Sequence, residues 1–210
     1  MSQRKLYISD IHFLHRNVLK LDERPFSSLD EMHEEIISRW NEAVTPGDQV
    51  YILGDLLWKN TDEGRDLLER LGGNLHLIVG NHDRWWEDKR TTKLFQSVSH
   101  YKEVKDGEKV VVLSHFPIPW FRTHRYAYGV HLFGHVHMTR EFKEVLRAQK
   151  SLMLNVEGLG ASYNVGAMVP YMDYTPRTLD EIIRSGEEFN HRFYKDEDSF
   201  TTKPKPPKLI

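Results

Sequence analysis

The residues of this chain that could do chemistry form short polar clusters, each directly after a run of apolar residues. Three of these polar side chains, Asn81, His82 and Asp83, occupy one turn, where they are costly to bury unless each finds a partner. The other clusters are Asp10 and His12, Asp55, His115, and His135 and His137. The chain has no cysteine. Oxygen and imidazole ligands without thiolate suit a pair of divalent ions such as manganese, iron, zinc or nickel.

Each cluster follows a predicted strand. The apolar runs span residues 6–8, 50–53, 75–79, 109–113 and 130–133, and each stops at a turn or loop residue. In open α/β sheets, the loops at the carboxyl ends of the strands converge and bind ligands. We therefore expect the polar clusters to meet at one edge of the sheet, provided that the strands are neighbours in that sheet.

Helices are predicted between these strands. Ser27 or Ser28 caps a helix that reaches residue 44, and Thr61 or Asp62 starts a helix through residue 71. A helical pattern also covers residues 141–150, and Thr178 caps the last helix. Strands that alternate with helices indicate an α/β layered fold.

Other short strands make the expected sheets mixed. Residues 98–104 and 109–113 are predicted to form a hairpin or strand pair around Asp106-Gly107, and short strands are expected at 152–156 and 163–165. We expect a single domain over residues 1–190 and a polar tail over 191–210, because the chain turns polar from His191 and ends in lysines and prolines.

Composition limits the partners. The net charge is −2, so a nucleic-acid duplex held by many phosphate contacts is not the default partner. The first residues run into a strand without the apolar core of a signal peptide, and no apolar run reaches the length of a membrane span. We expect a cytoplasmic protein without a membrane partner. The composition leaves the oligomeric state open.

In this order, Asp-x-His, Gly-Asp, Gly-Asn-His-Asp, a single His and Gly-His-x-His resemble the motifs of the calcineurin-like metallophosphoesterase superfamily. The match runs from Asp10 to His137. Phe13, His15, Asn17, Arg24-Pro25-Phe26 and Asn164-Val165-Gly166 are similar to a small bacterial and phage branch. The resemblance implies a two-layered β-sandwich of mixed sheets, flanked by helices, with a dinuclear metal site at the carboxyl rim of the strands.

The resemblance also implies roles for individual residues. Asp10, His12 and His137 would hold one ion, Asp55 would bridge, and Asn81, His115 and His135 would complete the second site. The catalytic group would consist of His82 as acid or phosphate stabiliser, Asn81, and Asp83, which could orient the His82 ring. Manganese is the favoured metal. Many relatives have an acidic residue soon after Gly-Asp, whereas Leu56, Leu57 and Trp58 follow here.

Substrate contacts are less defined. His15 and Arg24 are candidates, although Arg24 could equally be a surface ion-pair partner. Arg122 and Arg125 lie in an aromatic loop, residues 116–128, that could either stack bases and bind phosphates or simply pack on the sheet. The remaining histidines are expected to be structural or exposed, with His33 on a solvated helix face; they are His33, His76, His100, His131 and His191.

The expected function is metal-dependent hydrolysis of a phosphodiester or phosphomonoester, small and nucleotide-like. A metal-bridging hydroxide would attack, and His82 would assist. Two alternatives remain open: a nuclease acting on single-stranded nucleic acid, and a scaffold with the same fold but no catalysis. Scaffold relatives typically lack the catalytic histidine, which is present here as His82.

Overall fold

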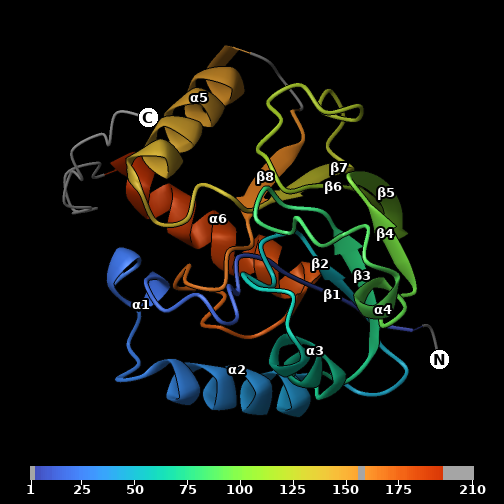
Figure 1. Ribbon diagram of the computed structural model, residues 1–210. Helices are drawn as coiled ribbons and strands as arrows, with labels where there is room; N and C mark the ends of the chain where they lie inside the picture. The colour runs from blue at the N-terminus through green and yellow to red at the C-terminus, as the bar shows by residue number, and fades with distance from the viewer. Residues whose placement is uncertain (1–2, 156–158, 196–210) are drawn as a thin grey trace.

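Two β-sheets form the centre of the computed structural model, which describes residues 3–155 and 159–195 (Figure 1). The five-stranded sheet has the order β4-β3-β2-β1-β9, in which β1 to β4 are parallel and β9 runs antiparallel to β1. Its strands are β1 (Lys5–Ile8), β2 (Gln49–Ile52), β3 (Asn74–Ile78), β4 (Ser97–Ser99) and β9 (Arg177–Thr178).

The four-stranded sheet has the order β5-β6-β7-β8. The hairpin of β5 and β6 is antiparallel, whereas β6, β7 and β8 are parallel. Its strands are β5 (Tyr101–Asp106), β6 (Lys109–Ser114), β7 (Gly129–Phe133) and β8 (Ala161–Asn164). The predicted α/β fold with mixed sheets is therefore confirmed.

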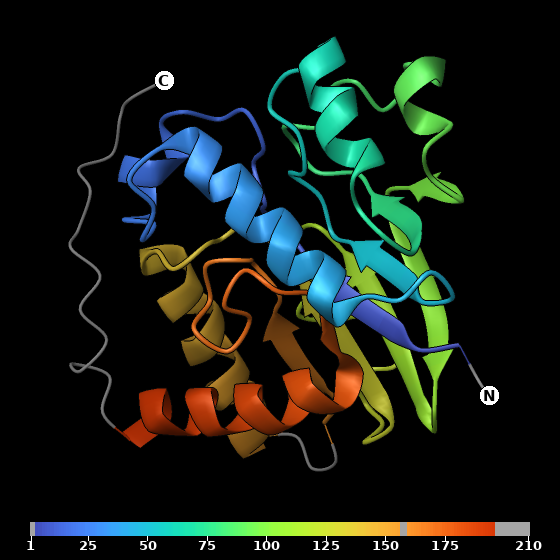
Figure 2. The ribbon, with the colours of Figure 1, turned by 90° about the horizontal axis from the view of Figure 1, so that it is seen from below.

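Helices surround the two sheets, as Figure 2 shows from below. They are α1 (Val18–Leu21), α2 (Leu29–Ala43), α3 (Asp62–Glu69), α4 (Lys89–Thr92), α5 (Arg140–Asn155) and α6 (Leu179–Lys195). Trp40 of α2 is fully buried, and its indole N–H donates to the carbonyl of Gly72 at 2.9 Å. This bond ties α2 to the chain segment just before β3.

Apolar side chains from both sheets form one core, so the sheets pack face to face. One polar link crosses this core: the Tyr7 hydroxyl of β1 donates to the Asp106 carboxylate at the end of β5 at 2.9 Å. The sandwich holds the carboxyl ends of its parallel strands together at one rim.

The predicted caps of α2 and α3 are present. Ser28 caps α2, because its hydroxyl accepts from the Glu31 amide at 3.1 Å, and Thr61 caps α3 in the same way through Gly64. At the start of α6, the Glu181 carboxylate accepts from the Thr178 amide at 2.9 Å.

Three predicted boundaries are wrong. Residues 98–104 are not one strand, because the chain passes from β4 in the first sheet to β5 in the second. The strand expected from residue 152 is instead the end of α5, which continues to Asn155; residue 156 lies outside the described part. The domain does not end at residue 190, because α6 continues to Lys195 and Phe193 is fully buried. The rest of the expected tail, 196–210, lies outside the described residues.

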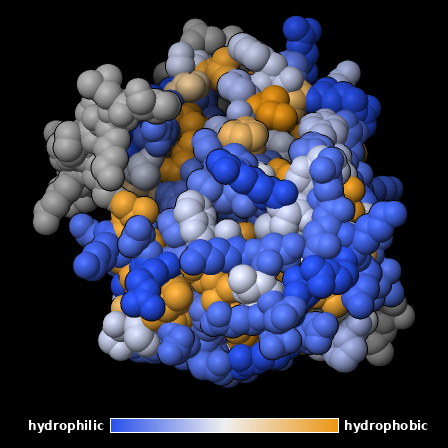
Figure 3. Space-filling model, viewed as in Figure 1, coloured by the Kyte–Doolittle hydropathy of each residue, from blue (hydrophilic) through white to orange (hydrophobic). Residues whose placement is uncertain are grey.

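The surface is mostly polar on the face seen in Figure 1. Figure 3 shows hydrophilic residues over most of this face, with apolar residues emerging in separate groups. Within residues 3–155 and 159–195, no helix is both long enough and apolar enough to span a membrane.

Candidate metal centre

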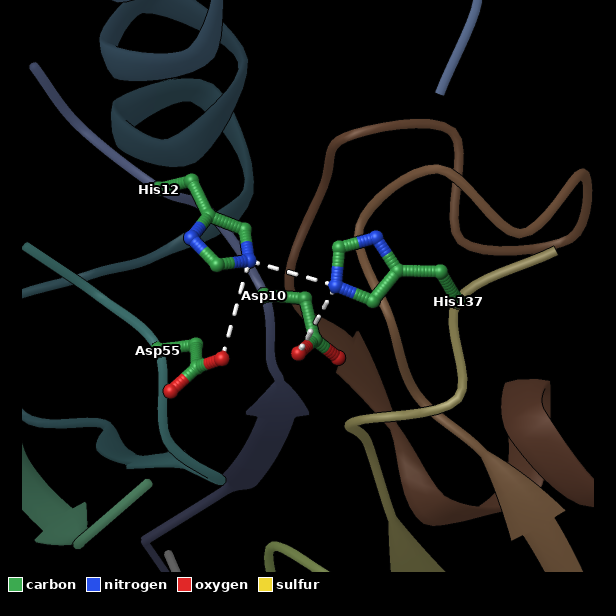
Figure 4. A group of neighbouring side chains, drawn as sticks. All are labelled: Asp10, His12, Asp55 and His137. Carbon is green, nitrogen blue, oxygen red and sulfur yellow. Dashed lines mark hydrogen bonds and ion pairs between the residues drawn. The ribbon is translucent and has the colours of Figure 1, made fainter. Parts of the chain in front are cut away.

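The predicted ligands lie together at the carboxyl rim of the sandwich. Each follows its strand by one to four residues, from the ends of β1, β2, β3, β6 and β7. The strands are parallel within each sheet, so their carboxyl ends point the same way. Figure 4 shows four of the side chains pointing toward one another: Asp10 and His12 from the loop after β1, Asp55 from the loop after β2 and His137 from the loop after β7.

The first group of ligands is Asp10, His12, Asp55 and His137, whose ligand atoms all lie within 4.8 Å of one another. His12 Nε2 lies 3.2 Å from His137 Nε2 and 3.7 Å from Asp55 Oδ2, and His137 Nε2 lies 3.6 Å from Asp10 Oδ1. Both carboxylates are buried, so their oxygens face this space rather than solvent.

The second group surrounds Asn81. Its Oδ1 lies 2.9 Å from His115 Nε2 and 2.9 Å from His135 Nδ1. Asp55 Oδ2 lies 3.6 Å from the same His115 nitrogen, so one Asp55 oxygen faces both groups. Asp55 therefore lies next to imidazoles of both groups.

The backbone at these positions is unusual. Five of the seven predicted ligands have a left-handed backbone, with φ between 44° and 69°, and they are Asp10, His12, Asp55, His135 and His137. Few residues other than glycine adopt this conformation, and such strained positions cluster at functional sites. Gly54 also has a positive φ, of 86°, and a Cβ there would lie 2.5 Å from His115 Nδ1. Only glycine therefore allows the loop after β2 to approach His115 this closely.

The first group fits a divalent cation. Metal ligation needs unprotonated imidazoles. Burial lowers the pKa of His12 well below its ordinary value, so this ring is neutral. His137 Nδ1 lies 2.8 Å from Asp22 Oδ1, so we assign its hydrogen to Nδ1, which leaves a lone pair on Nε2. Two imidazoles and two carboxylates that converge in this way need a cation or protons between them.

His82 lies beside this centre and is open to solvent. Its backbone N–H donates to Asp55 Oδ1 at 2.9 Å, and its Nε2 lies 3.9 Å from Asp55 Oδ2. The imidazole is 34% exposed and packs 4.6 Å from the Trp58 ring, which in turn stacks on His15 at 3.8 Å. Burial and the neighbouring His82 imidazole lower the pKa of His15 to about 4, so we expect His15 to be neutral at pH 7.

The role expected for Asp83 is wrong. Its carboxylate is fully buried and accepts from the backbone amides of Gly80 at 2.9 Å, Asp55 at 2.8 Å and Leu56 at 3.0 Å. Burial raises its pKa to about 6. Asp83 therefore fixes the loop that presents Asp55 and does not orient the His82 ring.

Arg24 is also placed differently from the expected phosphate contact. Its guanidinium is fully buried and donates to the carbonyls of Asp10 and Ile11, both at 2.7 Å. It also pairs with Asp22 at 3.0 Å. A buried guanidinium with these partners cannot reach a substrate, so Arg24 has a structural role in the loop after β1.

The remaining predicted contacts are dispersed. Arg122 pairs with Glu103 of β5 at 2.5 Å, and Arg125 is exposed on the same loop. The loop does begin at the centre, because Phe116 packs edge-to-face with His135 at 4.5 Å. The solvated position expected for His33 is wrong: the ring is buried, and its Nε2 accepts from the Leu14 amide at 3.1 Å.

The sequence interpretation missed Asp22, which contacts His137 and Arg24. The only signal in the sequence is an acidic residue two positions before Arg24, and such a pair also occurs on ordinary surface loops. Its contact with His137 spans 115 residues of sequence and could not be predicted from local pattern.

Comparison with known proteins agrees with this geometry. The chain is 34% identical over 187 residues to the uncharacterized protein MJ1445 of Methanocaldococcus jannaschii, covering 88% of this chain and 92% of that protein. The profile of calcineurin-like phosphoesterases matches residues 4–106, which include Asp10, His12, Asp55 and Asn81. The chain belongs to the calcineurin-like phosphoesterase family.

Solved structures are also similar to this chain. The structure of AQ665 from Aquifex aeolicus, a protein of unknown function, has 25% sequence identity and a TM-score of 0.65, and covers 88% of this chain and 100% of its own. YfcE, a phosphoesterase from E. coli, matches with 19% identity and a TM-score of 0.33 over 64% of this chain and 70% of its own. Family membership and the cluster of Asp10, His12, Asp55 and His137 support a metal-dependent phosphoesterase.

Proposed function

We propose that this calcineurin-like protein hydrolyses a small, nucleotide-like phosphodiester or phosphomonoester with the help of two divalent ions. The observation that carries this proposal is the position of Asp55, whose Oδ2 lies between the His12 and His115 nitrogens at 3.7 Å and 3.6 Å. One carboxylate oxygen facing two imidazole groups is the arrangement that two adjacent ions require.

Bound divalent ions would neutralise the phosphoryl oxygens and acidify the attacking water. The residues of the chain supply the rest. The amide of Asn81 and the carboxylate of Asp55 define the space between the two groups of ligands. Asp83 holds the backbone of Asp55 and Gly80 in place, so the distance between the loops after β2 and β3 is fixed before a substrate binds.

His82 is the proposed proton donor to the leaving oxygen. Its backbone is fixed by the bond to Asp55 Oδ1, and its partly exposed ring packs against Trp58, with Nε2 3.9 Å from Asp55 Oδ2. The ring can therefore reach solvent and a substrate on the open side of the centre. General acid catalysis of this kind contributes typically about 10²–10⁴-fold in rate.

The metal, the partner and the location are also part of the proposal. We propose manganese as the metal, a small phosphate ester as the partner and the cytoplasm as the location. The aromatic Phe116 beside His135 supports a substrate with a flat group, because aromatic side chains stack on bases.

The proposal is tested with protein purified without chelator and loaded with Mn²⁺. Hydrolysis is measured on two diesters, one with a good leaving group such as nitrophenolate and one with a poor, alkoxide leaving group. We expect His82→Ala to keep its metal and to lose about 10²–10⁴-fold in kcat on the poor leaving group. The loss on the good leaving group is smaller, because nitrophenolate needs little protonation.

His100→Ala is the matched control, since His100 also packs against a tryptophan, Trp86 at 5.0 Å, but is not a predicted ligand. It should keep both activities. Metal-loaded wild-type protein that hydrolyses none of the mono- and diesters contradicts the proposed function. His82→Ala that is as active as wild type on both esters contradicts the role of His82 alone.

A further inference from the structure

Asp22 connects a predicted metal ligand to a buried arginine. One carboxylate oxygen, Oδ1, accepts from His137 Nδ1 at 2.8 Å. The other, Oδ2, accepts from Arg24 Nε at 3.1 Å and Nη2 at 3.0 Å. The Asp22 side chain is 5% exposed and that of Arg24 is 0% exposed. Both carboxylate oxygens of Asp22 are thus held by hydrogen bonds, one from the partly buried His137 and the other from the buried Arg24.

Arg24 extends the connection to the loop after β1. Its Nη1 donates to the Ile11 carbonyl and its Nη2 to the Asp10 carbonyl, each at 2.7 Å. The loop that carries Asp10 and the loop that carries His137 are therefore joined through one ion pair. A buried carboxylate and a buried guanidinium would each be costly alone, whereas together they satisfy most of their hydrogen-bonding groups.

The imidazoles around the centre differ in what supports them. His137 has a carboxylate behind its ring, whereas His115 Nδ1 lies 2.8 Å from the neutral carbonyl of Leu53. His12 Nδ1 is buried without a hydrogen-bond partner among the described residues. A carboxylate behind a ligand histidine fixes the ring and makes its other nitrogen a better donor to a metal. Of these three imidazoles, it is His137 of the first group that has a carboxylate behind its ring.

We propose that Asp22, held by Arg24, is a positioning residue for His137 and makes the first site the tighter of the two. The first site is the one formed by Asp10, His12, Asp55 and His137, and this inference rests on the ligands assigned under the proposed function. Two carboxylates, Asp10 and Asp55, face this site, whereas the second site shares Asp55 and has the neutral oxygen of Asn81. The Asp22 charge is balanced by Arg24, so its effect acts through the bond to His137 Nδ1, which makes Nε2 a better metal donor, and the first ion binds here.

The test measures metal affinity directly in the full chain. Mn²⁺ is titrated in competition with a chelating dye, which gives two dissociation constants for wild type. Asp22→Ala should weaken the tighter constant about 10–100-fold, the usual effect of removing such a partner, and leave the weaker constant nearly unchanged. Asp22→Asn should have a smaller effect, because its amide oxygen can still accept from His137 Nδ1. This partial rescue would not follow from a purely structural role in pairing with Arg24.

Asp48→Ala is the matched control. Asp48 is another buried carboxylate paired with an arginine, Arg4 at 2.5 Å, and it is not a predicted ligand. It should lower stability without changing either constant. Where Asp22→Ala fails to fold, Asp22→Asn decides. A folded Asp22 variant with both constants unchanged overturns this inference alone. A wild-type chain that binds no Mn²⁺ overturns the assignment of the ligands and this inference with it.

Discussion

Removal of the Asp83 carboxylate tests how the centre is built. The side chain is fully buried in the loop after β3, and three backbone amides donate to it at 2.8–3.0 Å, with a fourth, that of Leu57, at 3.5 Å. Asp83→Ala leaves the amides of Gly80, Asp55 and Leu56 without their acceptor in a buried loop. We therefore expect a large loss of stability that does not depend on metal.

The magnitude follows from these three bonds. A hydrogen bond to a charged group contributes about 1.5–3 kcal/mol, so three independent bonds would sum to roughly 4.5–9 kcal/mol. Water that enters the vacated space recovers part of this, and the burial that raises the pKa of Asp83 to about 6 is itself a cost that the variant escapes. We expect a net loss of about 3–4 kcal/mol.

The assay is urea unfolding in the presence of EDTA, so that metal binding does not contribute. With an m-value of about 2–3 kcal/mol per M, the midpoint should fall by about 1–2 M. Asp88→Ala is the control, because Asp88 caps α4 and accepts from one backbone amide, that of Arg90 at 3.3 Å. Its midpoint should fall much less. An Asp83→Ala midpoint within about 0.3 M of wild type, less than a third of the expected shift, would refute the role assigned to this carboxylate.

The other predictions concern pH, the aromatic loop and the loop after β2. Burial lowers the pKa of His131 to about 4, and its Nε2 accepts from the Ile118 amide at 2.9 Å. Between about pH 6.5 and 4, His131 is protonated in the unfolded chain but not in the folded one, so the free energy of unfolding falls as the pH drops through this window, by at most about 3 kcal/mol. His131→Gln should lack this part of the pH dependence when thermal unfolding is measured. Arg122→Ala should leave KM for a nucleotide ester unchanged, because the guanidinium already pairs with Glu103. If KM rises for charged substrates only, Arg122 contacts the substrate. Gly54→Ala should give little folded protein in a solubility and circular-dichroism assay, and a variant with wild-type melting would contradict the close approach at this glycine.

The position of the predicted ligands at one rim could be derived from sequence because their signal is local. Each is a polar residue shortly after a short apolar strand, and parallel strands bring such positions to one edge. Asn81 and His135, 54 residues apart and after strands of different sheets, meet at 2.9 Å because the two sheets also pack face to face with these strand ends at one rim. The caps at Ser28 and Thr61 were equally accessible, since a cap depends on residues within one turn of helix.

The supporting residues could not be predicted in the same way. Arg24, Asp22 and Asp83 each act through partners that no periodic pattern links to them, such as the Asp10 carbonyl or the amide of Asp55. From sequence, a charged residue in a loop is expected to be exposed, and burial changes its role completely. The single strand predicted at 98–104 is wrong because tertiary packing, and not local sequence, decides to which sheet a strand belongs.

The most direct test of the dinuclear centre is metal analysis of wild type and Asp55→Ala, each purified without chelator and dialysed against Mn²⁺. Asp55 Oδ2 faces ligand atoms of both groups, so its removal should affect both sites, whereas loss of a terminal ligand affects one. We predict two ions per wild-type chain and loss of both, or of most of the metal, in folded Asp55→Ala. Full occupancy by two ions in Asp55→Ala would contradict the account.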